Sequence, residues 1–196
     1  MSTAISNQVT YQGAATPLLT KIEPRFGKVL GGTSVTFTGN KFSPTKEENT
    51  VIIDGIPCEV TASTTTTITC TTGKRPGLVK TSLEIYVKNY GRVSLQQKKF
   101  IYVNAWSDKT TWGGEFAPTE METVYIPPGL NLLVDVDKTE LLNAVIVEGS
   151  LIFAPHEDKT HHRYFDAHYI FVRNGTMEVG TEEHPYDSKI TLTLHS

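Results

Sequence analysis

Long apolar runs are missing from this 196-residue sequence, in which no stretch approaches the roughly 20 residues that a membrane-spanning helix needs. A basic segment followed by an apolar one is also missing at the start, so we expect no signal peptide, and an extracellular location would require a longer precursor. Positive charge is not in excess, because the formal net charge is −3. We therefore expect neither a nucleic-acid partner nor membrane contact by this segment itself.

Motifs that mark enzymes are equally scarce. The sequence has no nucleophile elbow of the GxSxG type and no glycine-rich loop that would cradle a phosphate. Asp135 and Asp137 stand two positions apart, and on a strand they would share one face, as paired catalytic carboxylates can. Two such residues more commonly project into solvent together. We therefore predict no catalytic residue and no cofactor.

Histidines provide the nearest approach to a metal motif. Four of them stand close to Glu157, Asp158 and Asp166 in the sequence, namely His156, His161, His162 and His168. Such a cluster can bind Zn²⁺, but its spacing matches no helix face, and the first three histidines fall in a charged, turn-like stretch. We predict a solvated loop without metal, in which His156, His161 and His162 are weak candidate ligands, and we expect His168 in a strand.

Only two cysteines are present, Cys58 and Cys70. No CxxC pair or matching histidine pair accompanies them, so their spacing does not indicate a metal site. Both lie in strand-like stretches. From the residues alone, a cross-strand disulfide and a pair of buried free thiols both remain open.

Short alternating segments separated by turn residues fill residues 17–103, a pattern typical of a β-sandwich. Val35 and Phe37 alternate with polar residues, so we expect both side chains to face the core of the sandwich. Asp54-Gly55 is a strong hairpin signal. Threonine is a good strand residue, so the threonine-rich run 64–72 also predicts a strand.

Residues 104–196 have a different character, with short apolar strands and glycine turns. A strand, a turn and a second strand are predicted around Glu148-Gly149 and again around Asn174-Gly175. Repeats of this kind indicate stacked β-coils, with at most one helical turn, at Leu141-Leu142. Asn174-Gly175-Thr176 is at once an N-glycosylation sequon and the signal of a type I′ hairpin turn.

Trp106 and Trp112, the only tryptophans, enclose a polar stretch that is followed by Gly113-Gly114. Two large rings that bury most of their surface would fix such a loop at both ends. Because few residues separate the last predicted strand of the first domain from Trp106, we expect this pair at the domain junction. Residues 1–16 are predicted to be a linker or the tail of a preceding repeat.

Residues 17–103 resemble an IPT/TIG domain, which has an immunoglobulin-like fold. The resemblance rests on Ile22-Glu23-Pro24, Gly27, Gly31-Gly32-Thr33, Val35-Thr36-Phe37-Thr38-Gly39, Phe42, Asp54-Gly55-Ile56-Pro57-Cys58 and Ile68-Thr69-Cys70. It implies a disulfide between Cys58 and Cys70, as in extracellular members of the family.

Residues 104–196 resemble the G-eight domain, which is named for eight glycines. The matching segments are Trp106-Ser107, Thr111-Trp112-Gly113-Gly114, Val124-Tyr125-Ile126-Pro127-Pro128-Gly129, Val147-Glu148-Gly149-Ser150-Leu151, Val179-Gly180-Thr181-Glu182 with Pro185, and Ile190-Thr191-Leu192-Thr193-Leu194-His195. Only six glycines follow Trp106, and Ser196 stands where the family usually has glycine. An IPT/TIG domain followed by a G-eight domain is the layout of the fibrocystin and fibrocystin-like family.

The resemblance implies an all-β chain: an immunoglobulin-like β-sandwich, then a β-helix-like or β-roll domain. It also implies a non-enzymatic extracellular module of a large cell-surface or ciliary protein, secreted or anchored in a membrane. This module would act as a rigid spacer and as a binding surface. Its expected partners are other extracellular domains of the same long chain, extracellular proteins or glycans.

Two other functions are carried by the same families. G-eight domains also occur in cell-surface hyaluronidases, so the alternative is the N-terminal part of a glycan-acting enzyme whose catalytic β-helix lies beyond this chain. IPT/TIG folds occur in some transcription factors as well. Those proteins need basic loops, and the acidic net charge and the lack of an arginine-rich loop argue against DNA binding.

Overall fold

The computed structural model describes residues 16–75, 77, 82–156 and 158–196. In these ranges the regular structure is almost entirely β-strand, with short 3₁₀ turns at Lys46–Glu48 (η2) and Lys109–Trp112 (η3). The helical turn expected at Leu141-Leu142 is wrong, because Leu142 opens a strand and its side chain is fully buried. None of the described helical segments is long and apolar enough to cross a membrane. The chain divides into two compact units.

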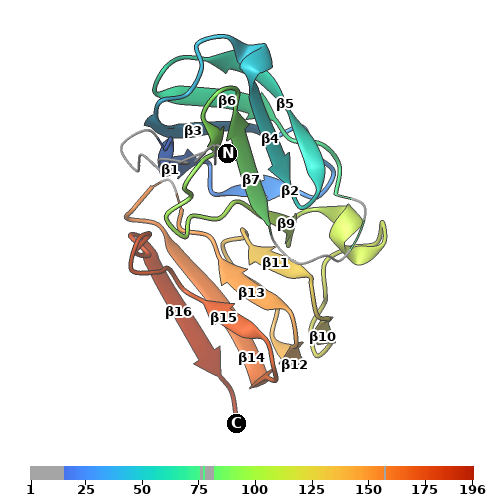
Figure 1. The fold of residues 1–196 in the computed structure, drawn as a ribbon. Coiled ribbons are helices and arrows are strands. Elements are labelled where there is room, and N and C mark those ends of the chain that lie inside the picture. Colours follow the sequence, from blue (N-terminus) through green and yellow to red (C-terminus); the bar gives the residue numbers. More distant parts are fainter. Residues whose placement is uncertain (1–15, 76, 78–81, 157) are drawn as a thin grey trace, which may run out of the picture. The chain divides into compact units, whose positions relative to one another are not determined.

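The first unit comprises the described residues up to Arg25, with Ser34–Gly73 and Ser82–Phe100. Its strands form one antiparallel sheet in the order β1-β3-β6-β5-β4-β7-β8. Their bounds are β1 Leu18–Glu23, β3 Ser34–Asn40, β4 Asn49–Ile53, β5 Ile56–Ser63, β6 Thr67–Thr71, β7 Leu83–Val87 and β8 Gly91–Arg92. Strand β5 pairs with β4 through its first residues and with β6 through its last, so it links the two layers of the sandwich (Figure 1).

The core of this unit confirms the predicted immunoglobulin-like sandwich. Val35 and Phe37 are fully buried on β3, as their alternation predicts. Asp54 and Gly55 both have positive φ values, 54° and 77°, and they connect the antiparallel strands β4 and β5. A disulfide joins Cys58 to Cys70 with the Cα atoms 5.6 Å apart, which confirms the pairing that the family resemblance implies.

The second unit takes in Phe26–Thr33, Ile101–Ser196 and the described residues between 74 and 81. It contains two sheets whose neighbouring strands are all parallel, in the orders β10-β12-β14-β16 and β15-β13-β11-β9-β2. Their bounds are β2 Phe26–Lys28, β9 Ile101–Ala105, β10 Thr123–Ile126, β11 Asn131–Val134, β12 Leu142–Val147, β13 Ser150–Phe153, β14 His162–Val172, β15 Thr176–Glu178 and β16 Lys189–Leu194. Phe26–Thr33 belongs to this unit, although it lies within the range 17–103 predicted for the first domain. The predicted boundary between the two domains near residue 103 stays a prediction.

From β10 onward the chain alternates between these two sheets, and each pass lies parallel to the strand two elements earlier (Figure 1). Ile126 thus pairs with Val147, and Val147 pairs in turn with Val172. This is the β-helix-like coil that the repeated short strands predict. The turn at Asn174-Gly175 joins strands of different sheets, so the predicted type I′ hairpin there is wrong, and Glu148-Gly149 is likewise a corner between sheets.

Glycine at these corners follows from the stacking of one coil on the next. A Cβ atom added at Gly149 would lie 2.3 Å from the carbonyl oxygen of Leu130, and one at Gly175 would lie 2.6 Å from that of Gly149. No side chain fits at such distances. The Gly signal therefore marks a close backbone approach between coils and not a reversal of the strand direction.

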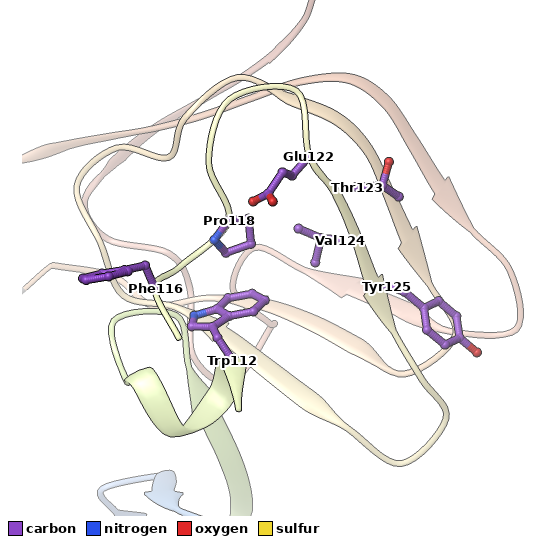
Figure 2. A pocket seen from close by; sticks show the side chains of 7 residues that line it. All are labelled: Trp112, Phe116, Pro118, Glu122, Thr123, Val124 and Tyr125. Carbon is purple, nitrogen blue, oxygen red and sulfur yellow. The ribbon is translucent and has the colours of Figure 1, made fainter. Parts of the chain in front are cut away.

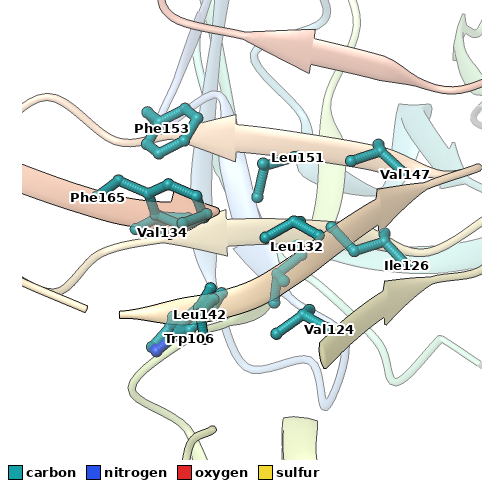
Figure 3. Packing of buried hydrophobic residues seen from close by; sticks show 12 residues of the cluster. Trp106, Val124, Ile126, Leu132, Val134, Leu142, Val147, Leu151, Phe153 and Phe165 are labelled. Atoms are coloured by element: carbon teal, nitrogen blue, oxygen red, sulfur yellow. The ribbon is translucent and has the colours of Figure 1, made fainter. Parts of the chain in front are cut away.

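The interior between the two sheets is filled by large apolar side chains (Figure 3). Val124, Leu132 and Val145 come from three successive passes of the chain and are at most 3% exposed. Phe153 and Phe165 meet edge to face, with ring centroids 5.2 Å apart. Each coil therefore contributes to one continuous core, and no single coil could bury its own apolar residues alone.

Candidate functional site

The two carboxylates considered as a catalytic pair are engaged separately. Strand β11 ends at Val134, so Asp135 and Asp137 do not share a strand face. Asp135 accepts hydrogen bonds from the backbone N and the hydroxyl of Ser107, at 2.9 and 2.6 Å. Asp137 lies instead beside the imidazole of His161. The paired-carboxylate interpretation is therefore wrong.

Asp137 and His156 occupy equivalent positions in two successive coils. Val134 and Phe153 are register partners on β11 and β13, and Asp137 and His156 each follow three residues later. The start of β14 closes the same corner, because the backbone N of Tyr164 donates to the carbonyl oxygen of Asp137 at 2.8 Å. The proximity of Asp137 and His156 follows from the strand register, which pairs Val134 with Phe153. A single sequence does not reveal that register.

At this corner the structure gathers three side chains of metal-ligand type: Asp137, His156 and His161. One ligand atom from each lies within 4.8 Å of the others. The imidazoles of His156 and His161 are stacked, with centroids 4.1 Å apart. The Nε2 atom of His161 is 2.9 Å from Oδ1 of Asp137. That contact lacks hydrogen-bond geometry, so this buried nitrogen has no hydrogen-bond partner among the described residues.

Charged groups surround this corner cluster. The buried guanidinium of Arg163 approaches Oδ1 of Asp137 at 3.7 Å, which is too long for a hydrogen bond. Asp158 lies next to His156, and hydrogen bonds from the hydroxyl and backbone N of Thr160 hold the pKa of its carboxyl below the ordinary value, with a smaller contribution from the two imidazoles. Lys159 pairs with Asp187 at 2.7 Å. The charged groups near the two imidazoles therefore include the carboxylates of Asp137 and Asp158 and the guanidinium of Arg163.

The other two histidines of the predicted cluster lie elsewhere. His162 is in hydrogen-bond contact with the Thr191 hydroxyl at 2.8 Å and stacks on Tyr164. His168 is in strand β14, as expected, and its Nδ1 lies 3.0 Å from the carbonyl oxygen of His195. Neither belongs to the three-residue corner cluster.

The tryptophan pair belongs to the core of the second unit. Trp106 is 3% exposed and meets Trp112 edge to face, with centroids 5.0 Å apart. The indole NH of Trp112 donates to the carbonyl oxygen of Trp106 at 2.8 Å. The polar stretch between them forms η3, and Gly113 ends it with φ of 70°. The role of this pair at the domain junction stays a prediction.

An aromatic surface covers the outer face of the sheet β10-β12-β14-β16. It consists of Tyr125, Tyr169 and Phe171, whose side chains are 54%, 58% and 53% exposed. Ile146 on β12 pairs with Tyr125 on β10 and with Phe171 on β14. The side chains of these three residues therefore form one row across the three strands. Tyr169 and Phe171 stack at 5.8 Å. We call this row the aromatic face.

A polar rim borders the aromatic face. Tyr125 donates its hydroxyl to Glu148 at 2.5 Å, and the Nε of Arg173 donates to the same carboxylate at 2.8 Å. These contacts, with the Tyr125 bond as the larger cause, lower the pKa of Glu148 below its ordinary value. The same bond raises the pKa of Tyr125. The rim therefore holds the Tyr125 ring in one orientation.

An open pocket of about 350 Å³ adjoins this face through Tyr125 (Figure 2). It is lined by Trp112, Phe116, Pro118, Glu122, Thr123, Val124 and Tyr125. Phe116 is 75% exposed, and the ammonium of Lys109 lies 4.5 Å from the centre of its ring. Aromatic walls with one carboxylate suit a ligand that has both apolar and hydrogen-bonding groups.

Asn174, the predicted glycosylation site, is exposed at the corner between β14 and β15 and has φ of 57°. Its sequon partner Thr176 is also exposed. The hydroxyl of Thr176 donates to that of Ser150 at 3.0 Å. The side chains of the sequon therefore lie on the surface.

Family models match both halves of the chain. The IPT/TIG domain model matches residues 17–102, and the G8 domain model matches residues 111–196. Among solved structures, the extracellular region of plexin A4 is 26% identical, with a TM-score of 0.39 and coverage of 45% of this chain and 8% of that one.

Curated relatives share both domains in one alignment. Fibrocystin-L of Homo sapiens is 31% identical over 187 residues, which is 95% of this chain and 4% of the relative. Fibrocystin of Mus musculus is 26% identical over 162 residues, which is 81% of this chain and 4% of the relative. The chain thus spans a small part of the length of these proteins. With its IPT/TIG domain followed by a G8 domain, it belongs to the fibrocystin and fibrocystin-like family.

Proposed function

We propose that this segment is a non-enzymatic extracellular module of a cell-surface or ciliary protein, in which it serves as a rigid spacer and presents a binding surface. The observation that carries the binding role is the aromatic face on the sheet β10-β12-β14-β16. Three large rings at more than half exposure are unusual on a sheet that has a filled core behind it. Proteins and glycans both bind to such faces through ring contacts.

The rigidity has a separate basis in the parallel coils. Each strand of the second unit is hydrogen-bonded to the strand of the next coil, and the glycine corners bring the backbones into direct contact. The strand pairing fixes the position of each coil against the next. The Cys58–Cys70 disulfide and the exposed Asn174 sequon are both suited to an oxidising extracellular setting.

Hyaluronan provides the test between this function and the enzymatic alternative. We expect the purified chain to leave the size distribution of hyaluronan unchanged after long incubation, with or without added Ca²⁺ or Zn²⁺. The reason is that Asp135 is hydrogen-bonded to Ser107 and is not paired with a second carboxylate for glycosidic chemistry. Gel electrophoresis or light scattering measures the size.

Reproducible shortening of hyaluronan, abolished by Asp137→Asn or His161→Ala, would contradict the non-enzymatic proposal. Retention of hyaluronan without shortening would support it and identify a ligand. In that case, Tyr169→Ser with Phe171→Ser should weaken retention, because both rings project from the aromatic face. Asn143→Gln is the matched control, since Asn143 is exposed on β12 and its change removes no ring.

Glycosylation at Asn174 is a second expected result. When the chain is secreted from a eukaryotic cell behind an added signal sequence, we expect its mass to fall on treatment with a peptide N-glycosidase. Asn174→Gln and Thr176→Ala should each abolish that shift, because both residues are needed for the sequon. Asn143→Gln should leave the shift intact. An unshifted wild-type mass would show that the corner is not accepted as a substrate.

A further inference from the structure

The corner cluster of Asp137, His156 and His161 has the ligand types and spacing of a transition-metal site. Its members come from two connections of the coil: Asp137 lies in the segment after β11, and His156 and His161 lie near the two ends of the segment that joins β13 to β14. The coil register, which makes Asp137 and His156 equivalent, is what brings them together. We propose that this corner cluster binds a Zn²⁺ ion, a property separate from the binding role of the aromatic face.

Distances within the cluster suit a small tetrahedral ion. Zinc lies about 2.0–2.2 Å from nitrogen and oxygen ligands, so two ligand atoms of a tetrahedral site are separated by about 3.4 Å. The Nε2 atom of His161 and Oδ1 of Asp137 are 2.9 Å apart, and all three ligand atoms lie within 4.8 Å of one another. The required separation between ligand atoms, about 3.4 Å, lies between these two values. Small side-chain rotations are therefore enough to complete the site.

The Nε2 atom of His161 provides an independent indication. It is buried, it faces the carboxylate of Asp137, and it makes no hydrogen bond to any described residue. A buried imidazole nitrogen is normally satisfied by a partner. A metal ion bound between Nε2 and the carboxylate satisfies both atoms at once, whereas the direct contact has the wrong angle to do so.

Nearby charge favours a cation at this corner. Asp137 and Asp158 contribute two negative charges, and Arg163 contributes one positive charge. The guanidinium of Arg163 is not hydrogen-bonded to Asp137 at 3.7 Å, so the carboxylate keeps its capacity to bind an ion. Neutral imidazoles add no charge, and imidazole is a metal ligand in that form.

One existing contact competes with the ion. The backbone N of Asp158 donates to Nδ1 of His156 at 2.9 Å. If zinc binds Nδ1 of His156, it replaces this hydrogen bond. If zinc binds Nε2, the imidazole proton of His156 moves to Nδ1, which can then no longer accept from Asp158. In both cases the turn that contains Asp158 has to shift. Asp158 is exposed, and its backbone N–H can then bond to water. We expect zinc binding to change the conformation of this turn.

The ligand set selects zinc over calcium and magnesium. Two imidazole nitrogens and one carboxylate suit a borderline ion, whereas Ca²⁺ and Mg²⁺ take six or more oxygen ligands. Three protein ligands leave one position of a tetrahedron for water, or for a group from a bound partner. The site therefore holds the ion at the surface of the coil corner and not inside the core.

The test is calorimetric titration of the full chain, purified without a histidine tag, with ZnCl₂ and then with CaCl₂. We expect one zinc ion per chain and no calcium binding. Asp137→Asn, His156→Gln and His161→Gln should each weaken zinc binding by at least about tenfold, since each removes one of three ligands. Replacement of zinc by Co²⁺ should give the visible absorption of a tetrahedral site, and His161→Gln should remove that absorption.

His162→Gln is the matched control, because His162 is adjacent in sequence but contacts Thr191 and Tyr164. It should bind zinc as the wild type does. Each variant is also melted without metal, so that a loss of folding is distinguished from a loss of ligand. Absence of stoichiometric zinc binding, unchanged binding by all three ligand variants, or an equal loss in His162→Gln would overturn the proposal.

Discussion

Replacing Trp106 with alanine should lower the free energy of unfolding of the second unit by about 3–5 kcal/mol, the range typical of large aromatic side chains in cores. The Trp106 ring is 3% exposed and contacts Phe165 at 5.9 Å between centroids as well as Trp112. Its removal leaves a cavity that the two sheets, held by parallel strand pairing, cannot close. Urea denaturation followed by far-ultraviolet circular dichroism measures the loss.

Two variants serve as controls for this result. Trp106→Phe keeps a ring in the core and should cost less than the alanine change. Trp112→Ala should also cost less, because Trp112 is only partly buried and packs at the edge of the cluster. A loss below about 1 kcal/mol for Trp106→Ala would contradict the central place of this ring in the core. Trp106→Ala also tests the predicted junction, through any change in how the two domains are aligned.

The first unit could be predicted from the sequence because its signals are local. Val35 and Phe37 alternate with polar residues, and the pleat alone places them on one face. Asp54-Gly55 sets the β4–β5 hairpin through positive φ values that few other residues adopt. The Cys58–Cys70 pairing was different, since the residues left it open and only the family resemblance decided it.

The second unit shows where local signals fail. Asn174-Gly175 has the composition of a hairpin turn, yet the strands on either side belong to different sheets. A turn signal specifies a change of direction, whereas the partner of each strand depends on which earlier coil it stacks against. The short strand β2 has no local signal either, because its partner β9 is distant in sequence.

Local sequence patterns could not predict the corner cluster, because its members are brought together by the stacking of the coils. The sequence drew attention to His156, His161 and His162 as neighbours, but the structure turns His162 away and brings in Asp137 from the preceding coil. His161 lies just before β14 and His162 opens that strand, so the two side chains have different neighbours, Asp137 for His161 and Thr191 for His162. The sequence placed Asp135 and Asp137 on one strand face, but β11 ends at Val134, before both residues.

Removal of the Cys58–Cys70 disulfide should lower the free energy of unfolding of the first unit by about 2–4 kcal/mol. The two residues are 12 positions apart, and the bridge limits the conformations of the unfolded loop between them. Both cysteines are also in the core, at 4% and 0% exposure, so their environment excludes water. Chemical denaturation of Cys58→Ala with Cys70→Ala, compared with the wild type, measures the loss.

Hydrogen exchange locates this effect in the chain. Protection should fall in β5 and β6, which contain the two cysteines, and in β3, because Val35 pairs with Cys70. The intrinsic tryptophan fluorescence reports on the second unit, where both tryptophans lie, so it serves as an internal comparison. Reductant should destabilise the wild type and leave the double-alanine variant unaffected. Alkylation of two thiols in non-reduced, folded protein prepared under oxidising conditions would show that the bridge is absent, and the stability difference would then have to come from side-chain volume alone.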